Sequence, residues 1–429
     1  MKQIGVGILG FGTVGAGVAD GVLKHREVIS KRAGVDIELK RIADLDITTP
    51  RGVEVPAEIL TADATKVLQG NDIDIVVETI GGTTIAKKFV LEALNNKKSV
   101  VTANKKLLAE YGDEIFDAAE KNGVDIYFGA AVGGGIPIIR VMREALVSNE
   151  IYSIHGILNG TCNYILTRME NEGLAFDTVL KDAQRLGYAE VDPSLDVDGF
   201  DTAHKACILA SLAYGFSPRL AEMNVEGIRN LSGLDVKYAS ELGYRIKLLA
   251  VITKNGRDVE LAVHPTLIPA SHMLSSVNDA FNAVMVNGDM SDCTMYYGRG
   301  AGRQPTASTV VGDIVDIARN IATSSPRYRR AVPNYASGDI KLKSPGEIAS
   351  KFYIRFMVAD RPGAFGTIAT ILGNNGVSIS AATQKPGSGS FLPVVALTHE
   401  AKLSNLEKAL EEISHSGVVD DEIIKLRVL

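Results

Sequence analysis

The sequence predicts an α/β protein of three parts: a parallel sheet covered by helices, an α+β domain, and a small βαββαβ domain. Strand and helix signals alternate over residues 4–128, which is the pattern of a parallel sheet with helices on both faces. Apolar and polar residues then alternate in the runs LLAVIT, VELAVHPTLI and FNAVMVNGD, which are typical of an antiparallel sheet with one covered face. Residues 348–429 carry the βαββαβ order of a ferredoxin-like domain.

Size and charge limit the classes of function. A chain of 429 residues is too long for one core, and at about 150 residues per domain it predicts about three domains. Its net charge of −6 leaves no basic surface for nucleic acid or an anionic membrane. The chain start lacks a signal-peptide pattern, and no apolar run approaches the roughly 20 residues of a spanning helix. The three cysteines are far apart, which indicates a reducing compartment, so we expect a cytoplasmic protein.

The expected elements divide the chain into four stretches. Residues 1–135 hold the parallel sheet, with a helix at about 306–321 completing that domain. Residues 136–305 form the α+β domain, in which helices dominate as far as about residue 217. Residues 322–347 are polar and contain three prolines, which predicts a linker before the domain at 348–429. The strands of the parallel sheet are expected at 4–9, 37–43, 73–78, 99–101 and 126–128.

A glycine-rich turn follows the first strand directly and opens a helix. It has the spacing G-x-G-x-x-G and consists of Gly10, Phe11, Gly12, Thr13, Val14 and Gly15. The first glycine permits a tight turn, the second lets the backbone approach a pyrophosphate, and the third lets helix and strand pack closely. The helix N-terminus adds free N–H groups for phosphate. The turn therefore predicts a Rossmann-type dinucleotide site and a nicotinamide-dependent oxidoreductase; the alternative is a structural turn that binds nothing.

An acidic residue at the end of the second strand of such a fold meets the ribose hydroxyls. Asp44 occupies that place in the run RIADLD. A carboxylate there repels a 2′-phosphate and favours NAD, although Arg41 could still reach such a phosphate. The alternative is that Asp44 only caps a turn.

Two lysines and a run of carboxylates are the candidates for the chemistry. Hydride transfer needs a proton partner for the oxygen of the reacting carbonyl. Lys105 follows the fourth expected strand, which places it at the carboxyl edge of the sheet, where ligands bind. Lys205 lies four residues after Asp201 on an expected helix, so the two share a face and can pair. Glu190 and Asp196 precede them, and such carboxylates suit the ammonium group of an amino acid. The alternatives are a solvated lysine and an exposed, ion-paired helix start.

Other catalytic groups are weaker candidates. Cys162 is flanked by polar residues in NGTCNY, whereas Cys207 and Cys293 lack an obvious base nearby in the sequence, so a thiol nucleophile fits at Cys162 alone. The seven histidines show no HxH or HxxxH pairing, which argues against a zinc site.

Several long stretches resemble homoserine dehydrogenases, and together they cover nearly the whole chain. They are GILGFGTVG, VVTANKKLLA, AAVGGGIPII, GILNGTCNYIL, GYAEVDPSLDVDGFDTAHK and GRGAGRQPTASTVVGDIVDIAR. The stretch DRPGAFGTIATILGNNGVSI resembles an ACT domain. The resemblance implies reversible reduction of L-aspartate 4-semialdehyde to L-homoserine with NAD or NADP, in the biosynthesis of threonine, methionine and isoleucine.

The resemblance also implies roles for individual residues. Lys205 matches the proton-donor lysine of the family, Lys105 its second active-site lysine, and Asp201 an acidic partner of the reacting end. The positions implied to bind substrate are Glu190, Asp196, Gly160, Thr161 and Tyr188. Cofactor contacts are expected from the glycine-rich turn, Asp44 and Lys105, and also from Ile80, Gly81, Thr102 and Gly302.

A monovalent cation, usually sodium, is implied as well. Backbone carbonyls of the VGGGIP loop would bind it, at the positions of Gly129, Val132, Gly134 and Ile136. Family members commonly carry Glu at position 129, so a side-chain contribution is missing here.

Assembly and regulation are expected by the same resemblance. The homodimer of the family would form through the sheet of the middle domain, and a homotetramer is the alternative. Because ACT domains commonly bind amino acids at paired interfaces, threonine is the expected effector, near Gly363 and residues 374–376; a purely structural oligomerisation module is the alternative. Two other interpretations stay open: a semialdehyde dehydrogenase that forms an acyl phosphate on a cysteine, and a non-enzymatic regulator that senses NAD(P) and an amino acid.

Overall fold

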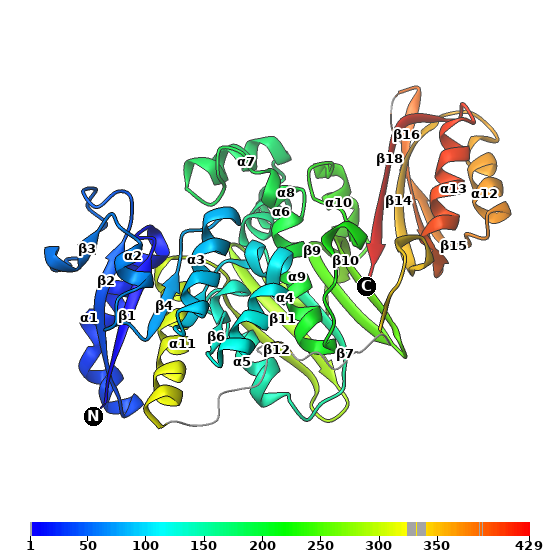
Figure 1. The fold of residues 1–429 in the computed structure, drawn as a ribbon. Helices are drawn as coiled ribbons and strands as arrows, with labels where there is room; N and C mark the ends of the chain where they lie inside the picture. The colour runs from blue at the N-terminus through cyan, green and yellow to red at the C-terminus, as the bar shows by residue number, and fades with distance from the viewer. Residues whose placement is uncertain (1, 324–331, 333–339, 386, 388) are drawn as a thin grey trace. The chain divides into compact units, whose positions relative to one another are not determined.

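The computed structural model describes residues 2–323, 332, 340–385, 387 and 389–429, drawn in colour in Figure 1. The chain forms two compact units, each built from three segments. Unit 1 comprises Met1–Tyr152, His204–Leu220 and Asn282–Ile340, and unit 2 comprises Ser153–Ala203, Ala221–Phe281 and Lys341–Leu429. None of the helices in the described ranges has the length and apolar composition needed to cross a membrane.

A parallel sheet organises unit 1. Its order is β3-β2-β1-β4-β5-β6, which reverses between β1 and β4, and ligands of open α/β sheets bind beyond the carboxyl ends of the strands at such a point. The predicted Rossmann-type sheet is confirmed, with a short edge strand, β3, in addition. The strands are β1 (Gln3–Leu9), β2 (Asp36–Ala43), β3 (Leu60–Thr61), β4 (Ile75–Glu78), β5 (Ser99–Thr102) and β6 (Ile126–Tyr127).

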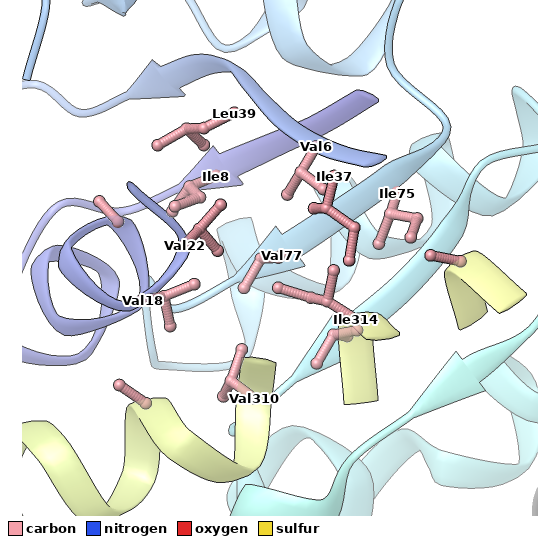
Figure 2. Packing of buried hydrophobic residues seen from close by; sticks show 14 of the residues in the cluster. Val6, Ile8, Val18, Val22, Ile37, Leu39, Ile75, Val77, Val310 and Ile314 are labelled. Atoms are coloured by element: carbon pink, nitrogen blue, oxygen red, sulfur yellow. The ribbon is translucent and has the colours of Figure 1, made fainter. Parts of the chain in front are cut away.

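Apolar side chains from strands and helices meet in one core of unit 1. Figure 2 shows side chains of β1, β2 and β4 packed against those of α1 (Thr13–Ala33) and α11 (Arg303–Thr323). The two helices touch so closely that a Cβ atom on Gly17 would lie 2.9 Å from the Arg303 carbonyl oxygen. Helix α11 covers the stretch where a helix was expected, about 290 positions after α1. The other long helices of this unit are α3 (Thr84–Asn95) and α4 (Lys105–Asn122).

The middle of the chain is less helical than expected. Strand β7 (Ile151–Ile157) lies inside the stretch predicted to be helical, and its sequence, IYSIHGI, is rich in the β-branched and aromatic residues that favour strands. A second strand, β12 (Asp292–Arg299), follows β11 (Phe281–Gly288) and was also missed. The helical prediction is therefore wrong at β7, because two flanking helices masked a short strand.

Unit 2 has an antiparallel hairpin at its centre. Strands β9 (Tyr244–Asn255) and β10 (Asp258–Pro269) pair along their whole length, and β7 pairs with β9 from Ser153 to Gly156. Strands β9 and β10 contain two of the three runs predicted to form an antiparallel sheet, and the third run forms β11. The helices of this part are α6 (Gly160–Glu172), α7 (Phe176–Arg185), α8 (Ser194–Val197), α9 (Phe200–Tyr214), which continues into unit 1, and α10 (Gly233–Glu241).

The C-terminal residues fold as the predicted βαββαβ domain. Its four main strands lie in the order β18-β14-β16-β15 and are antiparallel, and two helices complete it. This is the strand order of a ferredoxin-like sheet. The elements are β14 (Ala349–Ala359), α12 (Ala364–Asn374), β15 (Ile379–Gln384), β16 (Phe391–Thr398), α13 (Leu403–Ser414) and β18 (Val419–Val428).

Parts of the expected linker have regular structure. Residues 322–323 end α11, β13 (Lys341–Leu342) pairs with β10, and residues 345–347 form a 3₁₀ turn. Residues 324–331 and 333–339 of the linker prediction lie outside the described residues.

The C-terminal domain shares a sheet with the rest of unit 2. The end of β18 pairs in parallel with β10, with Thr266 opposite Arg427 and Leu267 opposite Val428. The Leu429 N–H donates to the Leu267 carbonyl at 3.0 Å. The last residues of the chain are therefore structural members of the sheet on which the middle of the chain is built.

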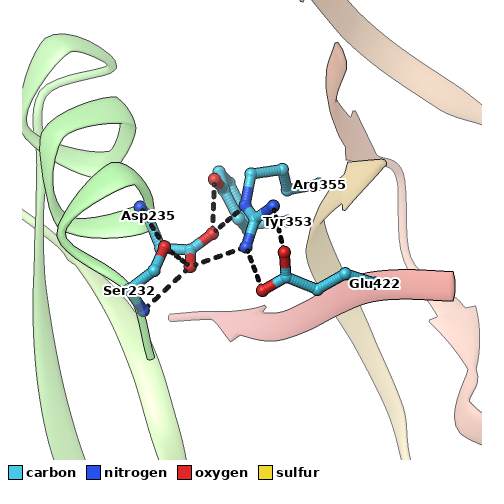
Figure 3. A network of polar contacts seen from close by, with 5 residues as sticks. All are labelled: Ser232, Asp235, Tyr353, Arg355 and Glu422. Carbon is cyan, nitrogen blue, oxygen red and sulfur yellow. Dashed lines mark hydrogen bonds and ion pairs between the residues drawn. The ribbon is translucent and has the colours of Figure 1, made fainter. Parts of the chain in front are cut away.

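A buried ion pair forms the second connection between the C-terminal domain and the rest of unit 2 (Figure 3). Arg355 on β14 donates from Nε to Asp235 Oδ1 at 2.7 Å, and the two side chains are 2% and 0% exposed. Asp235 also closes the capping box at the start of α10 with Ser232 and accepts from the Tyr353 hydroxyl at 3.2 Å. Glu422 on β18 completes the partners of the guanidinium. One carboxylate thus starts a helix of one domain and binds the central strand of the other.

Replacement of Arg355 by Met should destabilise the protein strongly. The change leaves the Asp235 carboxylate buried without its cation, and breaking such a pair costs about 3–5 kcal/mol. The matched control is Lys385→Met, which removes the exposed Lys385–Glu241 pair to the end of α10, where a loss of less than about 1 kcal/mol is expected. Urea unfolding of both variants measures the difference; equal losses would contradict the role assigned to the buried pair.

Candidate functional site

The glycine-rich turn has the geometry of a pyrophosphate cradle. Gly10 has φ +96°, and a Cβ there would lie 2.8 Å from the Thr79 backbone. A Cβ on Gly15 would lie 2.0 Å from the Gly10 carbonyl oxygen, whereas a Cβ on Gly12 would meet no protein atom within 4 Å. Two of the glycines are therefore required by the fold itself. Gly12 is not, and its open space is what a closely bound phosphate group needs.

Asp44 lies beside this turn. Its Oδ2 accepts from the Phe11 N–H at 2.5 Å, and its Oδ1 accepts from the Asp46 N–H at 2.9 Å. The carboxylate thus caps a turn and also borders the glycine-rich loop. Asp46 is held in the same way, and hydrogen bonds from Thr49 and Thr48 keep its pKa below the usual range. Two carboxylates therefore follow β2 in fixed positions.

A second turn at the carboxyl edge is organised by Glu78, which the sequence analysis did not single out. Glu78 ends β4 and is fully buried. Its Oε1 accepts from the N–H groups of Ile80 and Gly81 at 2.9 and 3.1 Å, and its Oε2 accepts from the Thr102 hydroxyl at 2.6 Å. Three residues expected at the cofactor site are therefore tied to one carboxylate. A charged residue at the end of the otherwise apolar run IVVE was the signal that could have identified it.

The two remaining positions expected near the cofactor in unit 1 are Lys105 and Gly302. Lys105 is half-buried and begins α4 directly after Asn104, whose side chain caps this helix and donates to the Gly82 carbonyl at 2.7 Å. Gly302 precedes α11 with φ +121°, a backbone conformation that favours glycine.

The loop expected to hold a cation is closely packed. The Gly129 N–H donates to Asp313 Oδ2 at 2.7 Å, and a Cβ on Gly129 would lie 2.9 Å from both carboxylate oxygens. Burial raises the pKa of Asp313 to about 7. The Gly134 carbonyl accepts from the Thr309 hydroxyl at 2.7 Å, and the Ile136 carbonyl accepts from the Ile138 N–H. Val132 is buried in the same loop. The Asp313 carboxylate thus fills the space of the missing side chain at position 129, and cation binding stays a prediction.

In unit 2, two of the expected carboxylates are brought together by a residue that the sequence analysis missed. The Asn159 amide nitrogen donates to Asp196 Oδ1 at 2.7 Å and to Asp201 Oδ2 at 2.8 Å. Asn159 follows β7 and caps α6, and both Asn159 and Asp201 are 4% exposed. Its position between a strand and a helix, in the run GILNGTCNYIL, was the available signal.

The pocket positions expected after Asn159 are also connected to one another. The Thr161 hydroxyl donates to the Tyr188 carbonyl at 2.6 Å, and Gly160 begins α6. The Tyr188 ring is exposed and lies 4.9 Å, centroid to centroid, from that of Tyr164. Glu190 is exposed, and its carbonyl accepts from the Gln184 amide at 3.0 Å. The start of α6 and the loop after α7 therefore form one surface of unit 2.

Burial and hydrogen-bond partners distinguish the candidate catalytic residues of this region from one another. Lys205 lies on α9 four residues after Asp201, as expected, and is 7% exposed. Asp198, in the same acidic run, forms a two-point pair with Arg229. Cys162 is fully buried, with its thiol directed at the Asp196 carbonyl at 3.2 Å. A buried thiol of this kind cannot serve as a reachable nucleophile.

Known proteins were compared with the chain as a whole. The family model "Homoserine dehydrogenase" matches residues 137–315, its NAD-binding domain matches residues 10–129, and an ACT domain matches residues 352–415. The homoserine dehydrogenase of Neisseria gonorrhoeae is 45% identical over 434 residues, with 100% of this chain and 99% of the relative covered.

The chain belongs to the homoserine dehydrogenase family. It is accordingly an oxidoreductase that uses NAD(P), and the non-enzymatic interpretation is set aside. The crystal structure of a homoserine dehydrogenase from Thiobacillus denitrificans is 42% identical, with a TM-score of 0.93, and covers 100% of this chain and 99% of that one. A hyperthermophilic archaeal homoserine dehydrogenase in complex with NADPH is 27% identical, with a TM-score of 0.64, over 76% of this chain and 100% of that one.

Alanine substitutions at Gly12 and Gly15 should separate the effect on NADH affinity from the effect on protein stability. Gly12→Ala should fold with near-normal stability, because φ there is −71° and the space is open, but should weaken NADH binding. Gly15→Ala should cost about 1–3 kcal/mol of stability, because its Cβ collides with the Gly10 carbonyl. Thermal unfolding and fluorescence titration with NADH measure the two effects. Unchanged NADH affinity in Gly12→Ala would contradict the assigned role of this glycine.

Proposed function

We propose that this member of the homoserine dehydrogenase family reduces L-aspartate 4-semialdehyde to L-homoserine reversibly, with Lys205 as proton donor. The observation that carries the proposal is the pair of carboxylates, Asp196 and Asp201, joined by one amide; Asp201 lies on α9, the helix that also holds Lys205. Such carboxylates suit the ammonium group of an amino-acid substrate. Glu190, Gly160, Thr161 and Tyr188 line the same surface of unit 2 and complete the substrate site in this proposal.

The glycine-rich turn, with open space at Gly12, would hold NAD(P)H, which would supply a hydride to the aldehyde carbon. The carbonyl oxygen gains negative charge, and Lys205 donates a proton to it; the amine that remains regains its proton from solvent. Lys105 at the start of α4 stabilises the developing charge. Burial of Lys205 limits competing proton exchange with water, and general acid catalysis of this kind contributes about 10²–10⁴-fold.

Lys205→Ala should lower kcat for homoserine oxidation by about 10²–10⁴-fold and leave coenzyme affinity nearly unchanged. The matched control is Lys106→Ala, because Lys106 is exposed and lies near Glu110, with an N–O distance of 3.8 Å. Steady-state kinetics and NADH titration give both quantities. Normal turnover in Lys205→Ala would remove this lysine from the mechanism.

The coenzyme preferred in this proposal is NAD. Asp44 and Asp46 present two carboxylates after β2 that backbone N–H donors hold in place. A 2′-phosphate would approach these charges, while Arg51 is already paired with Asp46 and the Arg41 guanidinium donates to the Lys40 carbonyl at 2.7 Å. The assay above, run with NAD and NADP in parallel, should give the higher kcat/KM with NAD; the opposite order would contradict this choice.

Threonine is the proposed feedback effector, bound between paired copies of the C-terminal domain in a homodimer. The expected contacts lie at opposite ends of α12: Gly363 stands before its first residue, and residues 374–376 comprise its last residue and the two that follow. A helix of 11 residues is about 16 Å long, so one amino acid cannot touch both ends within a single copy. We assign the threonine carboxylate to the N-terminal end, where backbone N–H groups favour an anion.

Two glycines of α12 allow this assignment to be tested. A Cβ on Gly366 or on Gly373 would meet no atom within 4 Å, so Asp fits at either position. Gly366→Asp places a negative charge at the N-terminal end and should raise the threonine concentration for half-inhibition by about tenfold or more, whereas Gly373→Asp should leave it unchanged. Inhibition assays, with light scattering to establish the dimer, measure this. Equal effects of the two changes, or no inhibition of the unmodified enzyme, would refute the proposal. Truncation is unsuitable, because β18 completes the sheet at β10.

A further inference from the structure

We infer that Asn159 is a positioning residue for the reaction, whose amide group holds the carboxylates of Asp196 and Asp201 together at the substrate site. The inference rests on the roles proposed above for these two aspartates. Asn159 lies outside the stretch GYAEVDPSLDVDGFDTAHK, which contains the two aspartates. The inference comes from three hydrogen bonds of the Asn159 side chain.

The orientation of the amide is determined by chemistry. Asn159 Oδ1 accepts from the Cys162 N–H at 2.8 Å, as an N-cap. An amide oxygen must face this donor, so the NH₂ group must face the two carboxylates. The exchanged orientation would set the amide oxygen against two carboxylate oxygens. The helix cap therefore fixes the direction in which the two N–H donors point.

The two acceptors need such a donor. Both carboxylate oxygens lie within hydrogen-bond distance of one nitrogen atom, so two negative charges are close together. The amide that they share offsets part of their mutual repulsion. Asp201 and Asn159 are both 4% exposed, which leaves little room for water to replace the amide. The thiol of Cys162 further holds the backbone of Asp196 through its carbonyl at 3.2 Å.

Helix capping alone does not explain the choice of asparagine. Ser, Thr and Asp cap helices about as well. Among these residues only Asn combines an acceptor for the cap with two N–H donors on a separate atom. Serine would cap α6 and lose the donors, and aspartate would cap it and add a third negative charge.

Two variants distinguish positioning from capping. Asn159→Ser keeps the cap and loses the donors, whereas Asn159→Ala loses both. For a positioning role, both should lower kcat/KM for homoserine by roughly 10- to 100-fold, as expected when hydrogen bonds to charged groups are lost, with the KM for coenzyme within about twofold of normal. The acid limb of the pH profile of kcat/KM should also move to higher pH, because a carboxylate that loses this hydrogen-bond donor is protonated more easily. Thermal unfolding should show Asn159→Ser more stable than Asn159→Ala.

The outcomes separate this inference from the proposed function. Normal kcat/KM in Asn159→Ser, with a loss only in Asn159→Ala, would show a cap and overturn the inference. An equal rise in the KM values for coenzyme and homoserine would also overturn it, because a general distortion would then be the cause. Asp196→Asn and Asp201→Asn are measured alongside. If both keep normal activity, the proposed substrate site fails; if both are impaired while Asn159→Ser is normal, the inference alone fails.

Discussion

The buried contact of Arg355 with Asp235 is the interaction on which the construction of unit 2 depends. The carboxylate caps helix α10, and the guanidinium comes from the central strand of the C-terminal domain. Together with the pairing of β18 on β10, it makes this domain part of one folded body with the rest of unit 2. Helix α10 in turn packs against α6, the helix that Asn159 caps.

In both candidate site regions, one buried polar side chain joins several other groups by hydrogen bonds. In unit 1, the Glu78 carboxylate joins the turn at Ile80–Gly81 to Thr102 on the next strand. In unit 2, the Asn159 amide joins two carboxylates. Each connector is buried, and each joins a neighbour a few positions away to a partner at least 24 positions away in the sequence. Such connectors orient other side chains while they themselves need not touch a ligand.

Much of the fold was predictable because its patterns are local. Strand and helix periodicity, the G-x-G-x-x-G spacing and the βαββαβ order of the last residues depend on neighbours a few positions away. The prediction failed at β7, where a seven-residue strand lies between helices, and short apolar runs do not distinguish strand from helix. Among site residues, Glu78 and Asn159 were missed because their partners are up to 42 positions away.

The sequence by itself determined the class of cofactor and the family, since glycine spacing and long motifs are properties of the chain. It also predicted a role for each glycine of the turn, and the structure supplies the steric basis: Gly10 and Gly15 serve the fold, while Gly12 leaves space open. The sequence left open what each carboxylate does. The tertiary structure decided that Asp198 pairs with Arg229, whereas Asp196 and Asp201 share an amide. The physical reason is that hydrogen bonds and steric limits act between atoms that only folding brings within a few ångströms of one another.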